Sequence, residues 1–101
     1  MKKQIVVIGL EQFGESIATT LWSIGHDVMA LDHNESLVQK ISSRVTHAAQ
    51  VDPTDESALR ELGITNFDVA VVAVPVIETS VLSTILLKKL GLPFGMSIIR
   101  H

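Results

Sequence analysis

The residues best suited to binding chemistry form a short turn near the N-terminus, between an apolar run at 4–8 and a helical pattern. This turn reads Gly9-Leu10-Glu11-Gln12-Phe13-Gly14. A complete dinucleotide-binding fingerprint is Gly-x-Gly-x-x-Gly, in which the first glycine allows the tight turn and the third allows close helix–strand packing. Gly9 and Gly14 occupy these two positions. The turn therefore predicts a loop that receives the phosphates of an adenine nucleotide at a helix N-terminus.

The second glycine position of the fingerprint is occupied by Glu11. Glycine there lets the backbone approach the pyrophosphate, whereas Glu11 brings a side chain and a negative charge. Two unit charges about 5 Å apart repel each other by roughly 1–3 kcal/mol over plausible effective dielectric constants. We therefore expect Glu11 to weaken nucleotide binding by about ten- to a hundredfold, unless its side chain turns into water or a divalent cation bridges it.

An acidic residue stands where a ribose-binding carboxylate is expected. Asp32 ends the second predicted strand and follows Gly14 by 18 residues. A carboxylate in this place accepts hydrogen bonds from ribose hydroxyls and opposes a 2′-phosphate. The sequence therefore favours NAD or a simple adenine nucleotide over NADP. His33, which follows directly, either lines the adenine side or is a solvated loop residue.

Two further loops end at the same predicted edge of the sheet, where open α/β folds bind ligands. Asp52 and Pro53 follow the third predicted strand, and Ala73 and Val74 end the fourth. Asp52 either faces the adenine base or ribose, or it caps the next helix together with Thr54. All four of these loop residues belong to the candidate nucleotide site.

Alternating strand and helix patterns run through the chain and position these loops. Apolar and β-branched runs predict strands at 4–8, 27–31, 44–50, 67–74 and 97–100. Helical spacing predicts helices over 13–24, after a cap at Asn34, from a cap at Thr54 to Gly63, and up to Leu90. Strict alternation with short links is typical of a parallel sheet covered on both faces. Residues 1–101 are therefore predicted to form a single Rossmann-like α/β domain, a doubly wound parallel sheet of about five strands.

The last predicted helix, 77–90, is apolar around most of its circumference. Ile77, Val81 and Ile85 form one stripe, and leucines extend it around the helix at 82, 86, 87 and 90. A helix that covers one face of a sheet needs an apolar arc of only about 100°. The surplus predicts that this helix meets another helix of its own chain or another subunit. A leucine-rich surface without a partner is the alternative.

Composition limits the function classes. The net charge of −3 and the eight dispersed Lys and Arg residues argue against nucleic acid and against a polybasic membrane patch. The best apolar run, 69–77, is about half as long as the roughly 18 residues that a membrane span needs, so no membrane insertion is expected. The absence of cysteine excludes disulfides and Cys-ligated metals. Without a signal-peptide pattern, the chain is predicted to be cytoplasmic.

Together these segments resemble the N-terminal domain of the RCK family, the regulators of K⁺ conductance, also called TrkA-N or KTN domains. Residues 6–14 are similar to the family's strand and Gly-Leu-Gly-x-Phe-Gly turn, and 52–55 resemble its Asp-Ala-Thr-Asp segment. Further similarity at 25–32, 62–73 and 78–91 covers nearly the whole chain in order. The departures are Glu11, Gln12 where some relatives direct an arginine at a terminal phosphate, and Pro75 in place of a glycine. The chain also ends before the family's sixth strand, so it is expected to be a truncated or minimal version.

The resemblance implies a regulatory domain that binds NAD(H), AMP, ADP or ATP and gates a membrane K⁺ channel or transporter by conformational change. It implies pairing into a homodimer or larger ring through helix 77–90. It also implies a position at the inner face of the cell membrane through the transport partner. No reaction is implied.

Two other function classes stay open. A small NAD-dependent oxidoreductase would use the same loop, but the chain has no tyrosine for a Tyr-x-x-x-Lys pair and four scattered histidines without metal-ligand spacing. No serine stands in a Gly-x-Ser-x-Gly elbow either, so we expect no enzyme activity. The stronger rival is a degenerate Rossmann interaction module that has lost its nucleotide, and Glu11 is the residue that favours it.

Overall fold

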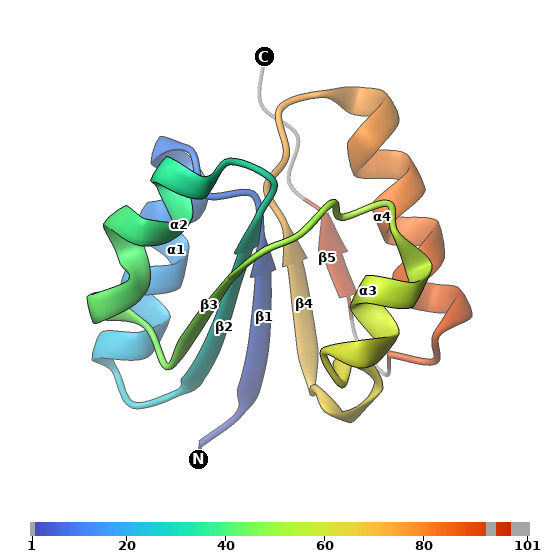
Figure 1. The fold of residues 1–101 in the computed structure, drawn as a ribbon. Helices are drawn as coiled ribbons and strands as arrows, with labels where there is room; N and C mark the ends of the chain where they lie inside the picture. The colour runs from blue at the N-terminus through green and yellow to red at the C-terminus, as the bar shows by residue number, and fades with distance from the viewer. Residues whose placement is uncertain (1, 93–94, 98–101) are drawn as a thin grey trace.

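A computed structural model of the chain describes residues 2–92 and 95–97 and confirms the doubly wound parallel α/β sheet (Figure 1). The strands are β1 (Gln4–Ile8), β2 (Asp27–Asp32), β3 (His47–Gln50), β4 (Val69–Val72) and β5 (Gly95–Ser97). They form one five-stranded sheet in the order β3-β2-β1-β4-β5. Every pair of neighbouring strands is parallel. The strand order reverses beside β1, and an open α/β sheet binds ligands at this type of switch point.

Helices cover both faces of the sheet (Figure 1). They are α1 (Gln12–Ser23), α2 (Glu35–Ile41), α3 (Glu56–Glu61) and α4 (Ile77–Lys89). Ile5 and Val7 belong to one buried cluster together with residues of α1 and α2. Val6 and Ile8 belong to a second cluster with residues of α3 and α4. Successive side chains of β1 thus enter opposite cores, which explains why the strand is apolar without interruption.

Several element bounds differ from the predicted ones. A 3₁₀ turn, Ser42–Arg44, occupies the start of the third predicted strand, so β3 begins only at His47. The fourth strand is shorter than 67–74, because Phe67 closes the turn Ile64–Asn66 through its N–H to the Ile64 carbonyl. The fifth strand was predicted too late: β5 pairs with β4 from Gly95, and residues 98–100 of the prediction lie outside the described residues.

The predicted surplus of apolar surface on α4 is present in the folded chain. Val81, Leu82 and Ile85 expose 46%, 52% and 56% of their surface, while Ser80 and Ser83 are buried on the inner side. The small serines let the helix approach the loop after β3, where Ser83 Oγ donates to the Pro53 carbonyl at 3.2 Å. The apolar stripe therefore faces outward, while Leu87 on the inner side packs into the core with residues of β1 and β4.

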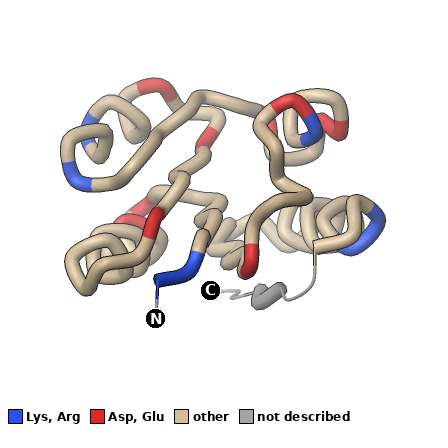
Figure 2. The backbone as a smooth tube through the Cα atoms, turned by 90° about the horizontal axis from the view of Figure 1, so that it is seen from below, with Lys and Arg blue, Asp and Glu red and all other residues tan. Residues whose placement is uncertain are grey.

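Two further features of the fold are the distribution of its charged residues and the length of its helices. Acidic and basic residues are interspersed along the backbone, and neither sign is confined to one part of it (Figure 2). Within the described part of the chain, none of the helices combines the length and the apolarity needed to cross a bilayer.

Candidate functional site

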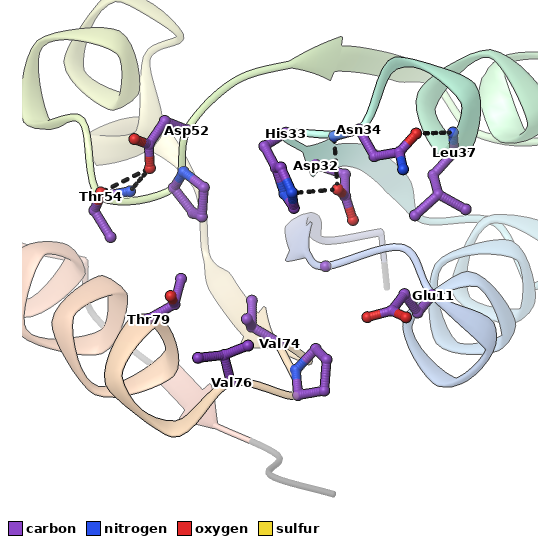
Figure 3. A pocket seen from close by; sticks show the side chains of 13 residues that line it. Glu11, Asp32, His33, Asn34, Leu37, Asp52, Thr54, Val74, Val76 and Thr79 are labelled. Atoms are coloured by element: carbon purple, nitrogen blue, oxygen red, sulfur yellow. Dashed lines mark hydrogen bonds and ion pairs between the residues drawn. The ribbon is translucent and has the colours of Figure 1, made fainter.

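A cavity of about 570 Å³ lies at the carboxyl edge of the sheet, beside the point where the strand order reverses. The loops that follow β1, β2, β3 and β4 all contribute to its lining (Figure 3). These loops are distant in sequence and meet because parallel strands bring their carboxyl ends to one edge. The lining residues are Gly9, Glu11, Asp32, His33, Asn34, Leu37, Asp52, Pro53, Thr54, Val74, Pro75, Val76 and Thr79.

The glycines of the first loop permit a close contact between three pieces of backbone. Gly9 has φ +98°, and a Cβ built there would lie 2.7 Å from the Ala73 carbonyl oxygen. A Cβ on Gly14 would collide with the Gly9 carbonyl oxygen. The start of α1 is thus packed directly against the end of β1. This is the role that the fingerprint assigns to its first and third glycines.

Asp32 holds this loop in place. Its carboxylate is buried, and Oδ2 accepts a hydrogen bond of 2.7 Å from the Leu10 backbone N–H. Oδ1 accepts a second bond, 2.9 Å long, from the Asn34 N–H and lies 3.2 Å from His33 Nδ1. Carboxylate oxygens have further lone pairs, so Asp32 can still accept a ligand hydroxyl. In this structure, however, the carboxylate fixes the chain between β1 and α1 through its bond to the Leu10 N–H.

Asp52, like Asp32, both borders the cavity and accepts hydrogen bonds from the protein. It lines the cavity, and its Oδ1 accepts hydrogen bonds from the Thr54 hydroxyl at 2.7 Å and the Thr54 N–H at 2.8 Å. These two bonds hold the pKa of the Asp52 carboxyl below its ordinary value, and the bond from the hydroxyl has the larger effect. The predicted cap at Thr54 is wrong: Asp55 caps α3 by accepting from the Ala58 N–H, because the Thr54 hydroxyl is bound to Asp52.

Glu11 stands at the entrance of α1 as its N-cap residue, with extended backbone and no side-chain capping bond. It is exposed at the cavity, across from Val74 and Val76 (Figure 3). The first backbone N–H groups of a helix lack partners within the helix, and this is where the fingerprint places a phosphate. The Glu11 side chain therefore shares its space with any phosphate bound there.

The cavity brings together seven of the residues predicted from the sequence: Gly9, Glu11, Asp32, His33, Asp52, Pro53 and Val74. Five others do not line it. Leu10 is a core residue, and Gly14 and Ala73 are buried behind the loop. Gln12 is exposed and Phe13 half-buried in the first turn of α1. Which of the twelve contact a nucleotide stays a prediction.

Other lining residues were missed or were assigned a different role. Asn34 was predicted only as a helix cap, and it does accept from the Ser36 and Leu37 N–H groups at 2.9 and 3.3 Å. Leu37 follows the inward spacing of α2, and this spacing does not reveal that its side chain also borders a cavity. Thr79, in the first turn of α4, also lies in the lining. Among the described residues, no three His, Asp or Glu side chains come together to hold a metal ion.

Comparison with known proteins identifies the family of this chain. The TrkA-N domain model matches residues 5–99. Over 92 residues the chain is 46% identical to the Ktr system potassium uptake protein A of Bacillus subtilis. The matched segment covers 90% of this chain and 41% of that protein. The chain thus spans about two-fifths of the length of this curated relative.

Solved structures share the fold. The NAD(P)-binding domain of an exopolyphosphatase-related protein from Archaeoglobus fulgidus superposes with a TM-score of 0.82 at 23% identity, over 98% of this chain and 73% of that one. The Kef CTD of Shewanella denitrificans in its AMP-bound form gives a TM-score of 0.76 at 18% identity, over 96% of this chain and 58% of that one. At these identities the likeness establishes the Rossmann-like fold alone.

Proposed function

The chain belongs to the TrkA-N domain family, and from this premise we propose that it is a nucleotide-binding regulatory domain of a K⁺ uptake system. The ligand is NAD(H) or an adenine nucleotide, and its binding changes the arrangement of the domain relative to a membrane K⁺ channel or transporter. The observation that carries the proposal is the cavity at the switch point, with the glycine turn on one side and Asp32 at its base. A protein of the same fold that holds AMP supports the ligand class.

In this proposal the domain carries out no reaction. It lies in the cytoplasm, at the inner face of the membrane, through its transport partner. A ligand can shift a conformational equilibrium only through its different affinity for the two states. Loops from four strands line the cavity, so a ligand that bridges them is suited to favour one arrangement of α1 and α4 over another.

The same proposal includes self-association through α4. Its outward stripe of half-exposed Val81, Leu82 and Ile85 supports an interface with a second copy in a homodimer or ring. We expect Ile85→Glu to weaken self-association at least about thirtyfold, because a buried charge at an interface centre costs about 2 kcal/mol or more. Sedimentation velocity over a concentration series measures this.

Ile24→Glu is the matched control, because Ile24 is 66% exposed at the end of α1, on the other helix layer. Its self-association should equal that of the native chain. A native chain that stays monomeric at the highest concentrations would remove the α4 interface from the proposal.

The nucleotide proposal is tested by thermal unfolding with NAD⁺, NADH, AMP, ADP and ATP. A ligand at about 100 times its dissociation constant stabilises the folded state by roughly 2.7 kcal/mol. For a domain of this size that corresponds to an increase in Tm of about 10–20 °C. Thr79→Phe fills the cavity from α4 and should abolish the increase.

Thr20→Phe, on the exposed side of α1, is the matched control and should respond like the native chain. If no nucleotide raises the Tm of the native chain, the nucleotide proposal fails. The degenerate interaction module, which keeps the fold without the ligand, then becomes the better description.

A further inference from the structure

The charges around the cavity do not match those of a polyphosphate. Its lining contains the carboxylates of Glu11, Asp32 and Asp52, and among the described residues no Lys or Arg lines it. Of the lining residues that the structure describes, His33 alone has a basic side chain. A site for highly charged phosphates usually supplies Arg or Lys against them. Gln12, beside the predicted phosphate position, offers no positive charge.

The three carboxylates differ in how they are compensated. Asp32 accepts from the Leu10 and Asn34 N–H groups, and Asp52 accepts from the hydroxyl and N–H of Thr54. The Glu11 carboxylate, by contrast, has no hydrogen bond or ion pair with any described residue. Of the three carboxylates, Glu11 is therefore the one whose negative charge is least offset by hydrogen bonds from the protein, so it acts most strongly on a bound ligand.

We propose that Glu11 is a specificity-determining residue that makes this cavity discriminate among adenine ligands by phosphate charge. This inference rests on the proposed nucleotide site and names its ligand class: AMP and similarly low-charged ligands are favoured over ADP and ATP. Glu11 stands at the N-terminus of α1, where the phosphate chain begins. Each further phosphate adds negative charge near the same carboxylate, and one such unit of repulsion at about 5 Å weakens binding by roughly ten- to a hundredfold.

The test uses Glu11→Gln, which removes the charge and keeps nearly the same shape. Calorimetric titration without divalent cations measures the affinities of adenosine, AMP, ADP and ATP for both chains. In the native chain we expect ATP to bind at least about tenfold more weakly than AMP. In Glu11→Gln we expect ATP binding to strengthen at least about tenfold, AMP binding to strengthen less, and adenosine binding to stay the same.

Glu61→Gln is the matched control, because it removes the same charge from an exposed position in the last turn of α3, outside the lining. It should leave the ratio of AMP to ATP affinity unchanged. If Glu11→Gln also leaves this ratio unchanged while AMP binds, the charge discrimination is wrong and the nucleotide site stands. If neither chain binds any of the four ligands, the proposed function and this inference both fail.

Discussion

Gly14→Ala is expected to destabilise the domain by about 2–4 kcal/mol, although helix propensity alone would favour alanine by about 1 kcal/mol. Gly14 lies inside α1 and is not among the glycines with positive φ, so the backbone conformation itself accepts alanine. The cost comes from space, because the new Cβ collides with the Gly9 carbonyl oxygen. That atom belongs to backbone held by β1 and Asp32 and cannot swing aside. Chemical denaturation measures the loss.

Gly25→Ala is the control for this experiment. A Cβ at Gly25 meets nothing within 4 Å, but its φ of +104° is unfavourable for alanine. We expect a loss of about 1 kcal/mol from this left-handed conformation. Equal losses at the two positions, or a gain at Gly14, would contradict the close packing of α1 on the first loop.

Asp32→Ala is expected to cost about 2–4 kcal/mol in the absence of any nucleotide. The buried carboxylate binds two backbone N–H groups, that of Leu10 in the loop after β1 and that of Asn34 in the loop after β2. Bonds to a charged acceptor contribute about 1.5–3 kcal/mol each, and removing the acceptor leaves a buried donor unsatisfied. The Tm should fall by roughly 10–25 °C for a domain of this size.

Asp68→Ala provides the comparison, because Asp68 Oδ2 also accepts a backbone N–H, that of Gln4 at 2.8 Å, but in an exposed setting. Water can replace that bond, so we expect a loss of less than about 1.5 kcal/mol. If Asp32→Ala were no more costly than Asp68→Ala, Asp32 would have no structural duty in the loop. Its place at the sheet edge would then be explained by ligand binding alone.

Most of the fold could be predicted because its signals are local. The apolar run from Gln4 to Ile8 and its abrupt stop at Gly9 define β1 within a few residues. The cap at Asn34 needs only a side-chain oxygen before a helical pattern, and the structure has it. The errors fell where two local patterns competed, as at Ser42–Arg44, where a 3₁₀ turn takes the start of the predicted third strand.

The candidate site was predictable in outline and not in its contacts. The glycine spacing correctly predicted close backbone packing at Gly9 and Gly14, because a Cβ at either position would collide with backbone atoms. The double role of Asp32 was missed, since its bond to the Leu10 N–H joins residues 22 apart. The cap at Thr54 was wrong for a related reason: Thr54 and Asp55 are both suitable caps, and the bond to Asp52 decided between them.

The parallel α/β sheet and the glycine turn follow from the sequence alone, because periodicity and backbone sterics act between near neighbours in the chain. The packing of the folded chain, by contrast, brings Leu37 and Val76 to the same cavity as Glu11. The same packing turns the apolar stripe of α4 outward, while Ser83 faces the loop after β3. Such outcomes depend on the register and order of strands, which fix how loops distant in the sequence approach one another.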